Sequence, residues 1–336
     1  MDIYLKRAIL HMLDRNNNTT IFSNELLDLT QGFTSEYVEK KIVKISSAQT
    51  KTGTLVADSK LGQLVREITK ENFIEKSQEL VENWAHFYNQ SEDGPSSDLL
   101  LALYEKDTQL YLAFMKLTYK EGITHFVEQE ENKVRNKLMI NRAILPASSA
   151  KPEEALAVNL SNLEFELLER RYEFSGEKRF YMSEYFIDQE EKPAMSMEES
   201  AREVRKLAKS IGKKYEDDEH EVLANVKEAL YDSFEEYGTI DNDFIAEKVF
   251  GENLSAKLEY KDEMMQALPK NVNELSEIRE ISEKKFGKQK LKMDNGIELI
   301  VPLDVYRDAN AVEFINNPDG TVSIMIKNIE KITNKF

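Results

Sequence analysis

The sequence LLLALYEKDTQLYLAFMKL, from Leu99 to Leu117, decides the fold. It contains two apolar runs rich in leucine and aromatic residues, separated by the short polar segment Glu105–Asp107. Two runs of this length around a polar turn predict a β-hairpin with at least one buried face. We therefore expect the first part of the chain to be built around an antiparallel sheet.

Strand-like and helical patterns lie on both sides of this hairpin. The predicted strands or extended pieces are Ile3–Leu13, Thr20–Leu29, Lys137–Leu145, Leu156–Val158, Leu163–Phe174 and Arg179–Phe186. The loop Ser175–Glu177 contains a glycine and is typical of a hairpin. Apolar residues recur at helical spacing behind Ser35, a predicted N-cap, and again from Lys60 to Phe87. These patterns predict an α+β domain over residues 1–190, in which helices cover an antiparallel sheet.

The remainder of the chain reads as a second domain. A polar, proline-bearing break at Gln189–Pro193 marks the expected boundary. Helices are predicted after Ser196, over Glu219–Tyr237 with Gly238 ending it, over Asp241–Phe250 and over Ser255–Ala267. The closing β-runs are Ile297–Pro302, Val312–Asn316 and Thr321–Asn328, with a turn at Asn317–Gly320 between the last two. Residues 195–336 are therefore expected to form helices finished by a small C-terminal β-sheet.

Composition limits the classes of function. The 336 residues carry a net charge of −17, and the average field of such a chain repels phosphate. Binding to DNA or to an anionic membrane would need a basic patch that acts locally. Cysteine is absent, which excludes disulfides and thiolate chemistry. No apolar run approaches the roughly 20 residues that span a bilayer, so we expect a cytoplasmic protein without membrane association.

No catalytic motif is recognisable. The four histidines are His11, His86, His125 and His220. They lack metal-ligand spacing, and the sequence has no glycine-rich phosphate loop and no nucleophile elbow. We therefore expect no enzyme, no metal and no cofactor. A remote alternative is a metal-dependent nuclease that uses Asp304 and Asp308, although no lysine of the kind nucleases use follows them.

The most distinctive feature is a basic stripe on the helix that follows the domain boundary. Its members are Arg202, Arg205, Lys206, Lys209 and Lys213. Their spacing of i, i+3, i+4, i+7 and i+11 places them on one helical face. The opposite face should be buried and contains Val204, Leu207, Ala208, Ile211 and Tyr215. The stripe predicts contacts with DNA phosphates, and its alternative interpretation is an ordinary solvated face.

Two further basic groups have the same two interpretations. Lys284, Lys285, Lys288, Lys290 and Lys292 surround Gly287 and predict a flexible basic loop that binds nucleic acid. The second group is Lys133, Arg135, Lys137 and Arg142, at the entry to a predicted strand. Its charges either contact a ligand from the sheet face or protect a sheet edge from unwanted pairing.

The order of these segments resembles the 37-kDa nucleoid-associated protein family of bacteria. The resemblance extends over the whole chain and depends on Leu99–Leu117, Leu156–Asn159, Leu163–Glu166, Arg179–Met182, Ile297–Val301, Val312–Asn316 and Asp319–Ile324. It implies association with the nucleoid and no catalysis, and it gives more weight to the phosphate-binding interpretation of the basic stripe. The chain departs from the family pattern in its lysine-rich Lys284–Lys292 and its acidic Glu216–Glu221.

The acidity of the chain leaves two mechanisms open. In the first, a homo-oligomer, most simply a dimer, presents its basic helices side by side and multiplies weak, sequence-independent phosphate contacts. In the second, the acidic surface binds a DNA-handling protein, such as a topoisomerase or a basic nucleoid protein, and never contacts DNA. Salt dependence discriminates between them, because direct binding weakens steeply as salt is added.

Overall fold

The computed structural model describes residues 3–130, 133–187, 192–267 and 278–333. The chain forms two compact units, Met1–Ser196 (unit 1) and Met197–Phe336 (unit 2), each with its own core. Most of the predicted break between the domains, residues 189–191, lies outside the described residues. Helices and antiparallel strands occur in both units, which confirms the predicted α+β class.

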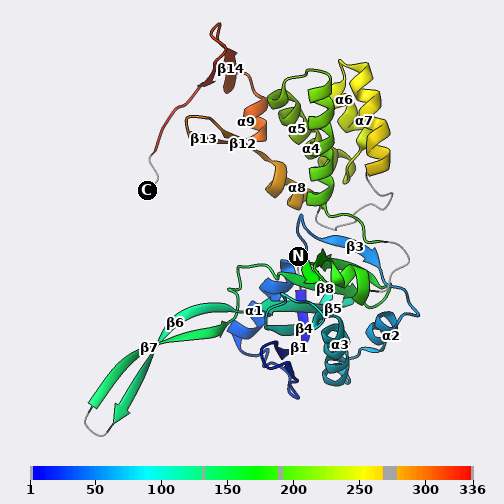
Figure 1. Ribbon diagram of the computed structural model, residues 1–336, viewed down its shortest axis with the longest axis vertical. Coiled ribbons are helices and arrows are strands. Elements are labelled where there is room, and N and C mark those ends of the chain that lie inside the picture. The colour runs from blue at the N-terminus through cyan, green and yellow to red at the C-terminus, as the bar shows by residue number, and fades with distance from the viewer. Residues whose placement is uncertain (1–2, 131–132, 188–191, 268–277, 334–336) are drawn as a thin grey trace. The chain divides into compact units, whose positions relative to one another are not determined.

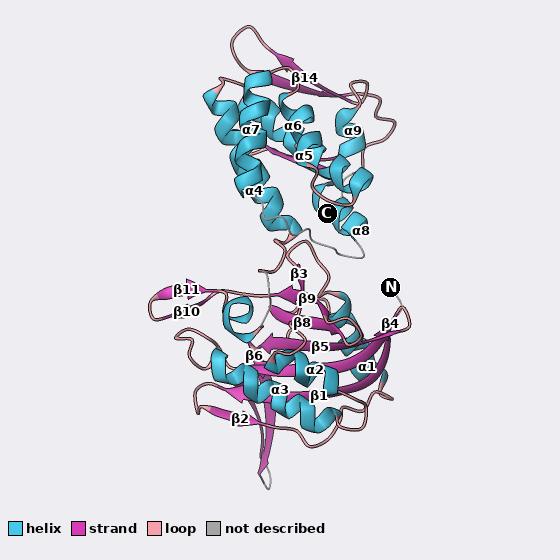
Figure 2. Ribbon diagram, turned by 90° about the vertical axis from the view of Figure 1, so that its right-hand side faces the viewer, coloured by secondary structure: helices cyan, strands magenta, loops and turns pink. Residues whose placement is uncertain are grey.

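Unit 1 is organised around one antiparallel sheet with helices on both faces (Figures 1 and 2). Its elements are β1 (Ile3–Asp14), β2 (Thr19–Ile21), α1 (Gly32–Val43), β3 (Lys51–Thr54), α2 (Lys60–Glu67), α3 (Phe73–Tyr88), β4 (Ser97–Lys106), β5 (Gln109–Thr118), β6 (Lys120–Glu130), β7 (Lys133–Ile144), β8 (Glu154–Asn159), β9 (Glu164–Leu168), β10 (Tyr172–Phe174), β11 (Glu177–Arg179) and a π-helical turn, η1 (Met182–Phe186). The seven-stranded sheet has the order β2-β1-β4-β5-β8-β9-β3.

The predicted hairpin is confirmed as β4 and β5 in the middle of this sheet. Successive residues of β4 point to opposite faces, and both faces are covered. Leu99, Leu101 and Leu103 pack in a core with α2, α3 and η1. Leu100 and Ala102 pack in a second core with α1. The unbroken apolar run in the sequence is explained by burial on both sides of the sheet.

The predicted strand Arg179–Phe186 is wrong. Only Glu177–Arg179 is extended, and Met182–Phe186 forms the turn η1. The carboxylate of Glu169 accepts hydrogen bonds from the Ser183 backbone N–H at 3.0 Å and its hydroxyl at 2.8 Å, which stabilises the start of the turn. The turn buries Met182 and Phe186 in the same core. An aromatic-rich run does not by itself distinguish a buried helical turn from a strand.

Two smaller predictions near the N-terminus also need correction. The helix α1 begins at Gly32 after Gln31, so Ser35 lies inside its first turn and is no cap; its hydroxyl instead donates to the Gly32 carbonyl at 3.2 Å. In the predicted extended piece Thr20–Leu29, only Thr20 and Ile21 belong to a strand, the short edge strand β2, which pairs with the end of β1.

Unit 2 is a helical bundle with short two-stranded ribbons. Its elements are α4 (Met197–Lys214), α5 (Glu219–Tyr237), α6 (Asn242–Phe250), α7 (Leu254–Ala267), α8 (Ile278–Phe286), β12 (Lys288–Lys292), β13 (Glu298–Pro302), α9 (Leu303–Arg307), β14 (Val312–Asn316) and β15 (Val322–Ile326). The helix predicted over Glu219–Tyr237 is confirmed as α5, and it ends at Gly238 in the left-handed conformation, with φ of 70°.

The basic segment Lys284–Lys292 is no flexible loop. Its first part ends α8, and its second part is the strand β12, paired with β13. The burial of Phe286 and Gln289 fixes both elements on unit 2. The C-terminal strands also differ from the prediction, because β12–β13 and β14–β15 are separate ribbons instead of one small sheet.

The buried histidine of unit 1 makes its stability sensitive to pH. His11 Nδ1 accepts a hydrogen bond from the Ser23 backbone N–H at 3.1 Å, and Nε2 therefore donates to Ser77 Oγ at 3.0 Å. Burial lowers the pKa of His11 from 6.5 to about 4. Between these values the unfolded chain binds more protons, so we expect the free energy of unfolding to fall as the pH drops from 6.5 towards 4.

The chain contains one tryptophan, Trp84, which is buried in unit 1 and whose fluorescence reports on that unit alone. Urea unfolding followed by this signal at several pH values above 5, where most carboxylates stay ionised, checks the effect. His11→Gln should reduce the decrease between neutral pH and pH 5. An equal decrease in both proteins would contradict the assignment to His11.

Candidate nucleic-acid interface

The basic stripe of α4 lies on the solvent side of unit 2. All five of its cations are exposed. On the buried side, Val204, Ala208 and Ile211 are at most 2% exposed, while Leu207 and Tyr215 are only half-buried. The high charge on one face and the apolar content of the other explain why this sequence forms an amphipathic helix with that face outward.

One predicted cation of α8 lies beside the first turn of α4, and β12 follows α8. Lys285 Nζ is 2.8 Å from Glu198 Oε2, which joins α8 to the first turn of α4. The rings of Phe286 and Phe234 stack with centroids 5.8 Å apart and anchor α8 on α5. The strand β12 follows directly, and its alternation exposes Lys288 and Lys290 while Gln289 is buried. Segments about 80 residues apart therefore present cations on the same part of unit 2.

The two groups meet at a residue that the sequence analysis missed, Lys227 of α5. Its amine donates a hydrogen bond to the backbone carbonyl of Lys288. The pKa of Lys227 is lowered, first by burial and then by the positive charges of Lys290 and Arg205. We name Arg202, Arg205, Lys227, Lys288 and Lys290 the cationic surface. Lys227 is the single cation in the sequence of α5, which is the signal that could have drawn attention to it.

Acidic neighbours neutralise only part of the predicted set. The paired cations are Lys206 with Glu203 at 3.7 Å, Lys209 with Glu219 at 2.5 Å, Lys284 with Glu280 at 3.6 Å, Lys285 with Glu198 at 2.8 Å, and Lys292 with Glu298 at 3.5 Å. Among the residues that the structure describes, no ion pair involves Arg202, Arg205, Lys213, Lys288 or Lys290. The exposed pairs are worth about 0–1 kcal/mol each, so an approaching phosphate competes with them at little cost.

The third predicted basic group belongs to unit 1 and is partly neutralised. Lys133, Arg135, Lys137 and Arg142 all lie on the strand β7. Lys137 Nζ is 2.6 Å from Glu128 and Arg142 Nε is 3.3 Å from Glu121, both on the partner strand β6. These cross-strand pairs bind the two strands to each other.

The remaining candidates for chemistry lie in separate surroundings. Asp304 lies on α9, and Asp308 follows that helix and accepts a hydrogen bond from the Asn310 backbone N–H. Between them, Arg307 is paired with Glu228 and Asp232 at 3.2 and 2.8 Å. No cluster of three acidic or histidine side chains suited to a metal ion occurs within the described ranges.

Exposed carboxylates are spread over unit 2. One group lies on the end of α5, on α6 and on the loop and helix of α7, and it includes Glu236, Asp243, Glu247, Glu252, Asp262 and Glu263. Others lie in the loop between α4 and α5, on α8 and on the ribbon β12–β13, among them Glu216, Glu283 and Glu298. The cationic surface lies on α4, the middle of α5 and β12. An anionic chain can therefore still present a local region of positive potential.

Taken together, the two units and the cationic surface define an α+β protein without a recognisable catalytic centre among its described residues. A family model described as nucleoid-associated protein YejK matches residues 9–333, and the chain belongs to this family. The resemblance stated from the sequence is thereby confirmed. No curated protein matches the chain. None of the helices described is both long and apolar enough to cross a bilayer.

Proposed function

We propose that the protein binds DNA directly, without sequence preference, through the cationic surface of unit 2, and that it does so as a self-associating molecule, most simply a homodimer. The chain belongs to a nucleoid-associated family, which supports the proposal that its partner is the DNA of the nucleoid. Lysine and arginine side chains on an exposed surface match phosphates, which carry charge and no sequence information.

The convergence of cations from α4, α5 and β12 is the observation that carries this proposal. Burial lowers the pKa of Lys227 most, and the nearby positive charges of Lys290 and Arg205 lower it further, so the free protein bears the cost of crowded like charges. A phosphate backbone relieves that repulsion and releases its own counterions. The net charge of −17 opposes the approach of DNA only weakly, since opposing charges are screened beyond about 8 Å at physiological salt.

Charge reversal on the cationic surface tests the proposal. We expect the wild-type chain to bind a duplex of arbitrary sequence with a log–log salt slope of about −4 to −5, which corresponds to five phosphate contacts. Changing Arg202, Arg205, Lys288 and Lys290 to Glu should lower the affinity at least tenfold at low salt and flatten the slope by about 3–4. Fluorescence anisotropy with a labelled duplex at several salt concentrations measures both quantities.

A matched control separates local contact from net charge. Lys60, Arg66, Lys70 and Lys178 are exposed cations of unit 1, and their change to Glu alters the net charge by the same amount. This control should change the affinity much less than the reversal on unit 2. Equal losses in the two proteins would contradict a local interface.

A second candidate is favoured by the acidic side of unit 2. The carboxylates of α6 and α7 stand beside the exposed apolar side chains Leu254, Leu258 and Met265 of α7. Such a mixture suits a basic protein, including a DNA-handling enzyme, that would bring this chain to the nucleoid. If the purified wild-type chain shows no retention of DNA at low salt, direct binding is wrong and this candidate replaces it.

A further inference from the structure

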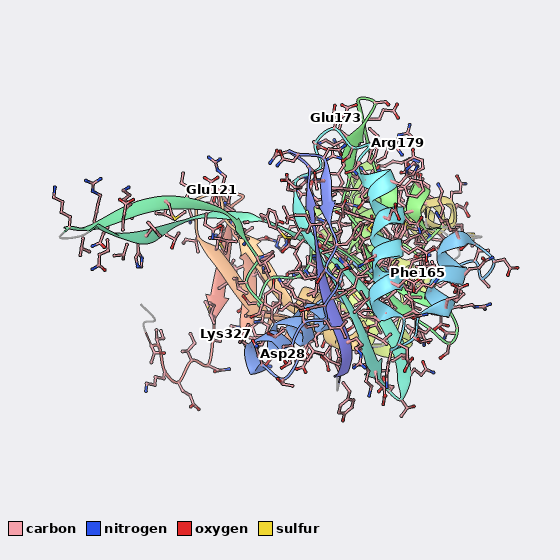
Figure 3. All side chains as sticks on the ribbon, turned by 90° about the horizontal axis from the view of Figure 1, so that it is seen from below. Asp28, Glu121, Phe165, Glu173, Arg179 and Lys327 are labelled. Carbon is pink, nitrogen blue, oxygen red and sulfur yellow. The ribbon has the colours of Figure 1, made fainter. Side chains whose placement is uncertain are left out.

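The strands β6 and β7 form a ribbon, here called the arm, that extends away from the seven-stranded sheet (Figures 1 and 3). The arm continues from β5, and its pairing is interrupted by a bulge between Lys120 and Gly122. Bulges bend a ribbon and redirect it. Gly122 allows this bend, because a Cβ there would lie 2.6 Å from the Ile144 side chain.

The root of the arm is held firmly by unit 1. Tyr119, which precedes β6, donates a hydrogen bond to Asp98 of β4. On the returning side, Tyr37 of α1 donates to the Pro146 carbonyl at 2.8 Å. Lys41 of the same helix donates to the carbonyls of Ala147 and Ala150 at 2.9 and 2.7 Å. Unit 1 therefore holds the base of the arm in place, and the rest of the arm projects from it.

One face of the arm is aliphatic and exposed. The pairing places Ile123 opposite Ile140, His125 opposite Leu138, Val127 opposite Asn136, and Gln129 opposite Val134, all on one face. The exposed fractions are 75% for Ile123, 52% for Val127, 68% for Val134, 79% for Leu138 and 52% for Ile140. Over the regularly paired residues Ile123–Gln129 and Val134–Ile140, this apolar face bears no lysine, arginine, aspartate or glutamate; the ion pair of Arg142 with Glu121 lies at its root.

The charged residues between Ile123 and Gln129 and between Val134 and Ile140 lie on the other face. Glu128 opposes Arg135, and Phe126 opposes Lys137, so these cations point away from the apolar face. Lys137 and Arg142 are already paired with Glu128 and Glu121 across the ribbon. A DNA backbone gains nothing from an uncharged aliphatic face, and the occupant of the apolar face is therefore another apolar protein surface.

A covering surface is also required by the stability of the arm. An isolated two-stranded ribbon is at best marginally stable in water, and it needs a third layer to form a core. The five aliphatic side chains expose on the order of 500 Å², the size of the largest apolar patches on monomeric proteins. Two such faces packed together bury about 1,000 Å², the lower limit for a specific interface.

We propose that the apolar face of the arm packs against the same face of a second copy of this chain. A two-fold contact uses one patch twice, so each arm supplies the layer that the other lacks. This inference rests on the self-association included in the proposed function and names the surface that produces it. Two DNA-binding units joined in this way would bind DNA with a much higher avidity than either alone.

Sedimentation equilibrium of the full chain without DNA tests the assignment. We expect the wild-type chain to form a dimer whose dissociation constant rises at least about tenfold when Val127 and Leu138 are both changed to Lys. The matched control is Phe126→Lys with Met139→Lys, which introduces the same charges at exposed apolar positions of the opposite face and should leave the dimer intact. Circular dichroism and Trp84 fluorescence establish that both variants fold.

The outcomes are distinguishable from those of the DNA experiment. A wild-type chain that stays monomeric, or a dimer that both variants leave unchanged, overturns the assignment of the arm. Loss of the dimer in both variants does the same, because it removes the specificity for one face. DNA binding by the cationic surface is measured separately, and a dimer that depends on the arm would remain even if DNA binding were not observed.

A second readout uses crosslinking, because the chain has no cysteine. With a cysteine-specific crosslinker we expect covalent dimers of the Leu138→Cys variant and none of the Thr124→Cys variant, whose change lies on the opposite face.

Discussion

Replacing Lys116 by methionine is expected to lower the free energy of unfolding of unit 1 by about 3–5 kcal/mol. Lys116 and Glu154 lie on the adjacent strands β5 and β8, both side chains are 0% exposed, and Nζ is 2.9 Å from Oε2. Lys116 also donates to the Tyr172 hydroxyl at 2.7 Å, and that hydroxyl donates to Glu154 at 3.0 Å. The ammonium faces the rings of Tyr88 and Tyr172 at 4.9 Å.

The expected loss comes from what remains after the change. Burial and the charge of Glu154 raise the pKa of Tyr172 far above its ordinary value, so its hydroxyl stays protonated but cannot replace a cation. The carboxylate would then be buried without a counter-charge. The double change Lys116→Met with Glu154→Leu should recover much of the stability, because it removes both charges.

Urea unfolding followed by Trp84 fluorescence measures these differences. The exposed Lys60→Met provides a surface control and should change the free energy by less than about 0.5 kcal/mol. A cost below about 1 kcal/mol for Lys116→Met would mean that Glu154 finds another partner or takes up a proton.

Changing Phe286 to alanine is expected to have the second large effect, a loss of about 3–5 kcal/mol in the free energy of unfolding of unit 2. The Phe286 ring is 7% exposed and lies nearly parallel to Phe234 of α5, with an interplanar angle of 7°. The cavity would loosen α8 and with it β12. On the proposed function, DNA affinity should also fall, although no charge has been removed.

Unit 2 contains no tryptophan, so calorimetry or circular dichroism of the full chain measures its unfolding. Phe286→Leu keeps most of the buried volume and should cost less than half as much. DNA binding is then measured at a temperature where the Phe286→Ala variant is destabilised but still folded. If the salt slope of DNA binding is unchanged there, α8 and β12 are not part of the interface.

The sequence was most informative where local pattern and tertiary environment agree. The hairpin β4–β5 has long apolar runs because both faces are covered, and α5 combines a capping residue, Asp218, with a terminal Gly238. In both cases the local signals are sufficient, because packing reinforces the same preference. The face of α4 that carries cations follows in the same way from helical spacing.

Elements whose environment opposes their pattern could not be predicted. The segment Lys284–Lys292 is rich in lysine and contains a glycine, yet the burial of Phe286 and Gln289 fixes it as a helix end and a strand. Strand β6 was missed because its two aliphatic residues, Ile123 and Val127, are four positions apart, with no period of two, and are exposed. Pattern arguments assume that apolar residues are buried within the same molecule.

The cationic surface shows which part of a site lies beyond sequence reasoning. The spacing along α4 predicts a stripe, but only the fold brings Lys288 and Lys290 to Arg205 through α5. Ion pairs such as Lys285–Glu198 join residues distant in the sequence, so the unpaired cations cannot be identified beforehand. That this surface contacts DNA stays a prediction for the salt titration.

The order of the strands in unit 1 has a consequence for synthesis of the chain. Strand β1 pairs with β4, which begins only at Ser97, and the edge strand β3 pairs with β9, which begins only at Glu164. A nascent chain leaving the ribosome therefore carries the apolar strand β1 and the polar edge strand β3 without their partners until β4 and β9 emerge. Such distant pairings slow folding, so the sheet should complete late and the growing chain should depend on chaperones.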